Sequence, residues 1–240
     1  MAYRFSAVFV DLDDTVLDFK RSEKEAVSKT LPVFGLEPTE SATELYSRIN
    51  EVQWKLLEKG VLSREEVLTR RFALLFETYA LPMPDPAEVW RVYEKNLSLS
   101  AHVIPGAAEA IAELKKDHRV FVATNGTEPI QRSRLRLSGV GGLFDGVFIS
   151  QEIGFNKPSR EFFDAMLERA GVSARDSVMI GDSLSSDIAG GAAAGMKTIH
   201  YMSRPASYPD GIRPDMTVTD VAALPGAVQL LELKTERSSL

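Results

Sequence analysis

Two aspartates stand two positions apart, directly after a short apolar segment near the N-terminus. Asp11 and Asp13 follow the nearly continuous apolar run Phe5–Val10, which is typical of a strand buried on both faces. Carboxylates this close repel each other unless a cation lies between them. Mg²⁺ prefers hard oxygen ligands and would relieve that repulsion. An ordinary Asp-rich turn is the alternative interpretation.

A hydroxyl and a lysine follow later apolar segments. Thr124-Asn125-Gly126 comes after the stretch 119–123, and a small hydroxyl with exposed backbone N–H groups before a helix suits an anion such as phosphate. Lys157 precedes Pro158, which favours an extended backbone at the entrance of a helix. Its ammonium can act as a point charge on phosphate or carboxylates. A plain strand-to-helix turn and a solvated surface lysine are the respective alternatives.

Two more aspartates follow the apolar segment 177–180. Asp182 stands at the end of that predicted strand, where it can complete a carboxylate site with Asp11. Asp187 is predicted to begin a helix over Asp187–Ala194, where a negative charge at the N-terminus is favourable. Its second possible role is to support a metal ion and its bound waters. The two roles are compatible.

The elements that must position these residues alternate between strand and helix. We predict strands over Phe5–Val10, Arg119–Ala123, Gly146–Ser150, Ser177–Ile180, Lys197–Tyr201 and Met216–Val218, and helices over 107–116, 128–138, 159–170 and 187–194. This alternation indicates an α/β fold, with a parallel sheet covered by helices on both faces. Ligands of such sheets bind beyond the carboxyl ends of the strands. Asp11, Thr124, Lys157 and Asp182 all follow predicted strands, so we expect them to converge.

Residues 19–98 show helical spacing and no predicted strand, as in the recurrence of Leu45, Ile49, Val52 and Leu56. Ser41-x-x-Glu44 and Ser63-x-x-Glu66 have the pattern of capping boxes, and Gly60 suits the position after a helix end. We therefore predict an α/β domain over 1–18 and 99–240 and a helical domain over 19–98. Because the insertion starts just after Asp11, we expect it to act as a lid.

Composition narrows the possible functions. The chain has 240 residues and no cysteine, which excludes thiol catalysis, disulfides and thiolate metal sites. Its net charge of -6 disfavours a nucleic-acid polymer as partner, but a local Mg²⁺ ion and a lysine would still allow a small phosphorylated metabolite to bind. No segment has the layout of a signal peptide or of a membrane span, so we expect a cytoplasmic protein without membrane partners, either a monomer or a homodimer.

Together these segments resemble the four motifs of the haloacid dehalogenase-like (HAD) superfamily. The motif residues are the DLDDT of 11–15, Thr124-Asn125, Lys157-Pro158 and the GDSLSSD of 181–187. The resemblance covers the whole chain. It implies a Rossmann-like parallel sheet with an inserted, all-helical C1 cap. It also implies a Mg²⁺-dependent hydrolase that acts on phosphoric monoesters through an aspartyl-phosphate.

The resemblance implies a role for each motif residue. Asp11 would be the nucleophile, and Asp13 would protonate the leaving alcohol and then activate water. Mg²⁺ would be held by Asp11, the backbone carbonyl of Asp13 and Asp182, with Asp187 supporting the metal ligands. The substrate phosphate would contact Thr124, Lys157 and the backbone amides of Leu12 and Asn125, and Lys157 would also offset the negative charge. An acid at Asp13 is typical of the phosphatases and phosphomutases of the superfamily rather than of its dehalogenases.

A narrower resemblance concerns the substrate. The stretches DLDDTVLDF, WKLLEKGVLSREEVLTRRF and TNGTEPIQRSRLRLSGVGGLFDGVFISQEIGFNKP are similar to the YjjG/YfnB-type pyrimidine 5′-nucleotidase group, as is GDSLSSDIAGGAAAG. It implies a nucleoside 5′-monophosphate as substrate. The alternatives are a sugar phosphomutase, a sugar-phosphate phosphatase and a noncatalytic phospholigand-binding protein on the same fold.

Within the predicted lid, several residues could contact a substrate. Arg70, Arg71 or Lys59 could bind substrate oxygens, and Phe19 or Trp54 could stack on a base. For each of them, a place on the exposed surface or in the core of the lid is the alternative. The three histidines show no spacing typical of a triad or a metal site, and we expect no role for them.

Overall fold

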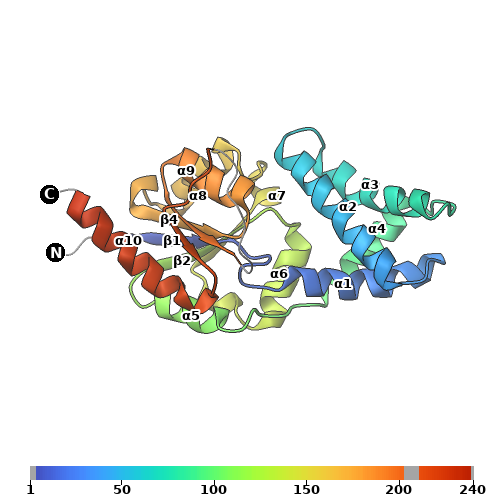
Figure 1. The fold of residues 1–240 in the computed structure, drawn as a ribbon, viewed down its shortest axis with the longest axis horizontal. Helices are drawn as coiled ribbons and strands as arrows, with labels where there is room; N and C mark the ends of the chain where they lie inside the picture. The colour runs from blue at the N-terminus through green and yellow to red at the C-terminus, as the bar shows by residue number, and fades with distance from the viewer. Residues whose placement is uncertain (1–3, 203–210, 239–240) are drawn as a thin grey trace. The chain divides into compact units, whose positions relative to one another are not determined.

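Short apolar strands form a parallel sheet in the part of the chain that carries the aspartates (Figure 1). The structure is a computed structural model and describes residues 4–202 and 211–238. The strands are β1 (Ala7–Val10), β2 (Arg119–Thr124), β3 (Gly146–Ile149), β4 (Ser177–Gly181), β5 (Lys197–Tyr201) and β6 (Met216–Val218). They lie in the order β3-β2-β1-β4-β5-β6, and every neighbouring pair is parallel. The predicted α/β fold is confirmed.

Helices cover both faces of this sheet. The helices of this part of the chain are α5 (Ala107–Leu114), α7 (Ser150–Ile153), α8 (Arg160–Ala170), α9 (Ala189–Ala194) and α10 (Leu224–Ser238), and a further helix, α6 (Glu128–Ser138), follows β2. Figure 1 shows α8 and α9 on one face and α5 and α10 on the other. On the first face, alternate strand residues such as Phe9 and Phe121 pack against Phe162, Phe163 and Met166 of α8. The strands are therefore buried on both sides, which explains their nearly continuous apolar sequences.

The strand register brings three motif segments to one edge of the sheet. Val10, the last residue of β1, aligns with Val122 of β2 and Ile180 of β4. The Asp11 amide then donates to the Ile180 carbonyl at 2.8 Å, so the ladder continues for one further residue. As a result, the residues that follow β1, β2 and β4 emerge at the same level of the sheet.

The inserted segment consists of helices α1 (Phe19–Thr30), α2 (Glu40–Glu58), α3 (Arg64–Thr78) and α4 (Pro86–Ser98), with a 3₁₀ turn at Leu31–Phe34. They enclose their own core, in which Tyr46, Phe72 and Tyr93 pack ring against ring at centroid distances of 5.1–5.6 Å. Among the helices in the two described ranges, none is long and apolar enough to cross a membrane.

Packing divides the chain into two units whose bounds differ from those drawn from the sequence. Unit 1 comprises residues 1–18, 103–128 and 138–240, and unit 2 comprises 19–102 and 129–137. The middle of α6 groups with the inserted helices because Ile130 belongs to their buried apolar cluster and Arg134 Nε donates to the Ser100 carbonyl at 3.1 Å. The sequence pattern shows α6 as a helix but not which helices it packs against.

One of the two predicted capping boxes exists. The Glu66 amide donates to Ser63 Oγ at 3.2 Å and the Ser63 amide donates to Glu66 Oε2 at 2.7 Å, which confirms the box at the start of α3. The box predicted at Ser41 is wrong, because α2 begins earlier. Thr39 has the extended backbone of an N-cap and accepts a hydrogen bond from the Ala42 amide at 3.2 Å, which places Ser41 inside the first helical turn.

This difference generates a stability prediction. Ser63→Ala removes a cap acceptor and should lower the free energy of unfolding by about 1 kcal/mol. Ser41→Ala is the matched control and should change it by less than about 0.5 kcal/mol. Urea denaturation of both variants checks this, and equal losses would contradict the assignment of the caps.

Candidate active site

Asp11 is held at the carboxyl end of β1 by a compact turn. The Leu12 carbonyl accepts the amides of Val16 and Leu17, and the Asp14 amide donates to the Leu17 carbonyl at 2.7 Å. Asp14 adopts a left-handed conformation with φ 57°, which aspartate tolerates better than most residues. This turn buries Asp11 almost completely and keeps Asp13 close enough to act on its charge.

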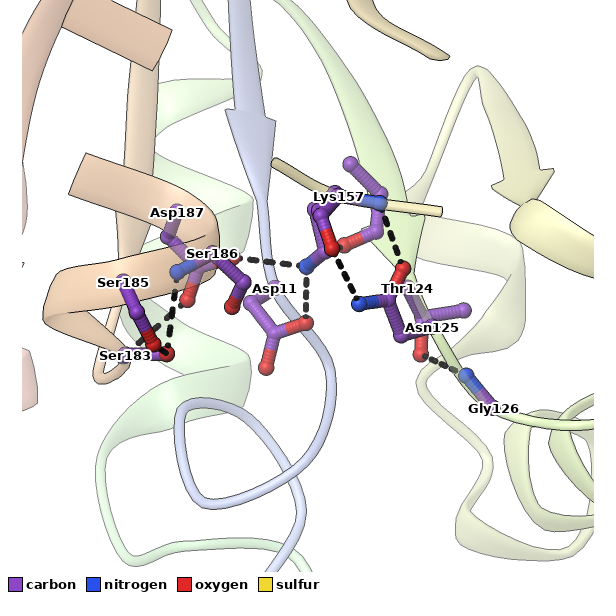
Figure 2. Close-up of polar contacts among 10 residues, drawn as sticks. Asp11, Thr124, Asn125, Gly126, Lys157, Ser183, Ser185, Ser186 and Asp187 are labelled. Carbon is purple, nitrogen blue, oxygen red and sulfur yellow. Dashed lines mark hydrogen bonds and ion pairs between the residues drawn. The ribbon is translucent and has the colours of Figure 1, made fainter. Parts of the chain in front are cut away.

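Lys157 joins three segments through its ammonium group (Figure 2). Nζ donates to Asp11 Oδ1 at 2.6 Å, to Asp187 Oδ1 at 2.7 Å and to the Ala123 carbonyl at 2.6 Å. These three bonds match the three N–H donors of an ammonium group. Burial alone would lower the pKa of Lys157, but the carboxylates of Asp11 and Asp187 raise it above its usual value. The lysine is therefore a buried cation that compensates two carboxylates at once.

Asp187 lies in a single π-helical turn, Leu184–Ile188, and not at the start of a helix. The predicted helix 187–194 is thus corrected, since α9 begins at Ala189. The reason is local: Ser183 Oγ caps the turn by accepting the Ser186 amide at 3.2 Å, so the turn starts before Asp187. Asp187 Oδ2 accepts the Ser183 amide at 3.1 Å, while Oδ1 accepts from Lys157. Both oxygens of this buried carboxylate therefore have protein donors.

Three carboxylates come close enough to share a cation. Asp11, Asp182 and Asp187 can each present one oxygen within 4.8 Å of the others. The pKa of Asp11 is raised to about 8, because burial and the charges of Asp187 and Asp13 raise it more than Lys157 lowers it. Burial and the charge of Asp11 likewise raise the pKa of Asp182 well above its usual value. The raised pKa values show that it is unfavourable to keep these buried carboxylates ionised together. Hard carboxylate oxygens at this spacing fit Mg²⁺, which would stabilise their ionised form.

The segment after β2 closes the site on its other side. Thr124 is the last residue of β2 and is buried, and its Oγ1 accepts the Gly126 amide at 3.2 Å. The Asn125 side chain bonds to the backbone of Lys157, with Nδ2 donating to its carbonyl at 2.9 Å and Oδ1 accepting its amide at 2.8 Å. Figure 2 shows Thr124 and Asn125 beside the Lys157 segment. The structure thus brings together Asp11, Thr124, Asn125, Lys157, Asp182 and Asp187.

Three features of this site were not predicted. They are the Ala123 carbonyl that binds Lys157, the Asn125 side-chain contacts and His200, whose Nε2 lies 2.9 Å from the Asp182 carbonyl. Burial lowers the pKa of His200. The sequence signal for His200 is its position in the strand Lys197–Tyr201, where it pairs with Gly181, the residue before Asp182. The spacing of histidines typical of a triad or a metal site does not detect a histidine that contacts a backbone carbonyl.

Among the possible substrate contacts in the inserted helices, Arg71 is buried in unit 2. Its Nη1 donates to Asn50 Oδ1 at 2.6 Å, and Asn50 Nδ2 donates to Glu23 Oε1 at 2.6 Å. Its guanidinium also lies 4.9 Å from the ring centroid of Tyr93 and 5.1 Å from that of Trp90. Arg71 therefore belongs to the core of unit 2.

Other residues in that set have different surroundings. Arg70 and Lys59 are exposed, and Trp54 lies under the guanidinium of Arg64 at 5.7 Å. Phe19 lies 5.6 Å from the guanidinium of Arg134 within unit 2.

Residues 5–195 match the family described as haloacid dehalogenase-like hydrolase. The chain belongs to this hydrolase family. It is 34% identical over 196 residues to the HAD-hydrolase YfnB of Bacillus subtilis, covering 81% of this chain and 83% of YfnB. Identity to the pyrimidine 5′-nucleotidase PynA of Streptococcus pneumoniae is 34% over 203 residues, with 84% of each chain covered. For the pyrimidine 5′-nucleotidase YjjG of Escherichia coli it is 27% over 218 residues, covering 90% of this chain and 95% of YjjG.

A solved structure of one of these relatives is similar to this chain in fold. The magnesium-bound structure of YfnB from Bacillus subtilis superposes with a TM-score of 0.86 at 32% sequence identity. The match covers 94% of this chain and 99% of that one. The predicted membership of the HAD family and the Rossmann-like fold are confirmed.

The buried network in unit 2 generates a stability prediction. Asn50→Ala removes the side chain that links Glu23 and Arg71 and leaves two buried charged groups without that partner. We expect the free energy of unfolding to fall by about 2–3 kcal/mol. Arg70→Ala, a change at an exposed neighbour, should cost less than about 0.5 kcal/mol. Urea denaturation measures both, and an unaffected Asn50→Ala variant would show that the network adds no stability.

The raised pKa of Asp11 generates a prediction for the metal-free protein. Because this pKa is about 8 in the folded state and 3.8 ordinarily, the folded state binds more protons than the unfolded state between these values. Stability should therefore fall as the pH rises through this window. Thermal unfolding in EDTA between pH 5 and 8.5 measures the slope, which Asp11→Asn should flatten. Asp164→Asn, a change at an exposed carboxylate of α8, should leave it unchanged. A slope that Asp11→Asn does not alter would refute the prediction.

Proposed function

We propose that the protein is a Mg²⁺-dependent phosphomonoesterase that acts through an aspartyl-phosphate on a nucleoside 5′-monophosphate. The observation that carries this proposal is the position of Asp11, a buried carboxylate at a strand end between the ammonium of Lys157 and two further carboxylates. A carboxylate nucleophile needs neighbours that fix its direction and stabilise developing charge, and this cluster supplies both.

The proposed reaction has two steps. A carboxylate oxygen of Asp11 attacks the phosphorus, the P–O bond to the alcohol breaks, and Asp13 gives its proton to the leaving oxygen. Asp13 then takes a proton from a water molecule that attacks the phosphorus, which releases phosphate and restores Asp11. The electron pair of each broken bond stays with the departing oxygen, so no oxidant or second substrate is needed.

The other residues position and stabilise the phosphoryl group. Thr124 Oγ1 and the amides of Leu12 and Asn125 would donate to its oxygens. We assign Lys157 to charge compensation, because its three donors already bind Asp11, Asp187 and a carbonyl. A phosphoryl oxygen would have to displace one of these contacts.

The carboxylate group fits a magnesium site. Asp11 and Asp182, with the Asp13 backbone carbonyl, would hold the ion, while Asp187 would support them because both of its oxygens already accept protein N–H groups. The bound Mg²⁺ would neutralise charge on the phosphoryl oxygens.

The proposal of a nucleotide substrate is supported by the relatives PynA and YjjG, both named pyrimidine 5′-nucleotidases.

The test is an assay of phosphate release. We expect turnover of UMP, dUMP or dTMP, and of p-nitrophenyl phosphate, that requires Mg²⁺ and stops in EDTA. Asp11→Asn should lower kcat by about 10⁴-fold or more, because the nucleophile is lost. Asp164→Asn is the control for a change of carboxylate to amide and should keep full activity.

Several outcomes would contradict this proposal. Metal-independent turnover or an active Asp11→Asn variant would refute the mechanism. Conversion of a hexose 1-phosphate to its 6-phosphate without phosphate release would indicate a mutase. Nucleotide binding without turnover at any tested metal would indicate a noncatalytic protein.

A further inference from the structure

Asn125 forms two hydrogen bonds with the backbone of one residue. Nδ2 donates to the Lys157 carbonyl at 2.9 Å, and Oδ1 accepts the Lys157 amide at 2.8 Å (Figure 2). A primary amide that binds both backbone groups of a single residue acts like the partner residue of a strand pair. It restricts both the position and the rotation of that residue.

The segment that carries Lys157 is a loop that follows α7. Lys157 lies between α7 and α8, eight residues beyond the end of β3, so its backbone is not part of a strand. A local bond from the Ser159 amide to the Asn156 carbonyl at 2.8 Å closes the turn that follows. The side chain of Asn125 therefore joins this loop to the end of β2.

The position of Lys157 has to be accurate. Its ammonium must reach Asp11, Asp187 and the Ala123 carbonyl together, at distances between 2.6 and 2.7 Å. A shift of the backbone by a fraction of an ångström would favour one carboxylate over the other. Asp11, Asp187 and Lys157 are all buried, so a carboxylate that loses its contact with the ammonium destabilises the folded protein.

Asn125 is well placed to prevent that shift. It directly follows Thr124, which ends β2, so its backbone is anchored by the sheet. Ala123, whose carbonyl binds the ammonium, is two residues before it. The same short segment of chain thus binds Lys157 at its backbone and at the end of its side chain.

We propose that Asn125 is a positioning residue, whose side chain fixes the Lys157 ammonium against Asp11 and Asp187. This role is distinct from any contact of the Asn125 backbone amide with phosphate. Only its kinetic test rests on the proposed function.

The first test does not need activity. Acetic anhydride labels accessible amines, and mass spectrometry follows the rate at each lysine. In Asn125→Ala, labelling of Lys157 should be at least about threefold faster, because the segment opens more often. Labelling of the exposed Lys55 should not change.

Gln151→Ala is the matched control for this test. Gln151 Oε1 accepts the Glu128 amide at 2.8 Å, so this variant also breaks a hydrogen bond between the segments after β2 and β3. It leaves the contacts of Asn125 in place. Unchanged labelling of Lys157 in Asn125→Ala, or an equal rise in Gln151→Ala, would overturn the proposal.

The second test uses phosphate release from p-nitrophenyl phosphate. Asn125→Ala should lower kcat by about 10–100-fold and change KM much less, as is typical for residues that orient a functional group. In a Lys157→Gln background the same change should have less than about a twofold effect, because Asn125 acts through Lys157. Equal losses in both backgrounds would overturn the proposal. If the wild-type chain hydrolyses no ester, the proposed function fails, and the labelling test still decides the role of Asn125.

Discussion

The site depends on the repulsion among carboxylates that are buried together. Two unit charges 4.8 Å apart repel by about 3 kcal/mol at an effective dielectric constant of about 20, which exceeds the net value of about 1 kcal/mol for one hydrogen bond. Asp11, Asp182 and Asp187 carry three such charges if all are ionised, and Lys157 cancels one of them. The remaining charge of two matches a divalent cation. Burial and the same repulsion raise the pKa values of Asp11 and Asp182.

Glycines at a few positions of the fold let neighbouring side chains pack very close to the backbone. A Cβ at Gly181 would lie 2.2 Å from Asp187 Oδ2, so only glycine leaves room for the buried carboxylate beside β4. A Cβ at Gly190 would lie 2.4 Å from the Phe163 ring, so the small residue lets α9 pack closely on α8. Gly181 therefore leaves room for a carboxylate of the charged cluster, and Gly190 leaves room for the packing of α9 against α8.

Much of this arrangement is predictable from the sequence, for a physical reason. Each strand is a short run of buried apolar residues, and parallel strands place their following residues at one edge, so Asp11, Thr124 and Asp182 had to converge. Contacts made through the backbone were not predictable in this way. The Asn125 side chain is hydrogen-bonded to the Lys157 backbone, and Ser183 Oγ accepts the Ser186 amide. These contacts depend on loop geometry, which leaves no periodic pattern in the sequence.

The burial of Arg71 shows the corresponding limit for the inserted helices. Its sequence position next to the exposed Arg70 gives no sign that Asn50 and several rings surround it. Helical periodicity predicts the apolar face, but a charged residue on that face is recognised only when its partners on other helices are known. The same holds for α6, whose pattern predicts a helix but not its neighbours.

The point of insertion explains how a large helical segment can begin only eight residues after Asp11 without disturbing it. Residues 19–102 leave and re-enter unit 1 at adjacent positions, because Leu17 forms an antiparallel bridge with Val103 and the Ile104 amide donates to the Val16 carbonyl at 2.9 Å. These contacts close the insertion at its base. The entropic cost of closing a loop grows only slowly with the length of the loop. A long insertion therefore destabilises the turn that holds Asp11 only slightly. Every residue of the charged cluster lies in unit 1, and the position of Asp11 is therefore fixed by the sheet and by this closure, whatever the inserted helices contain.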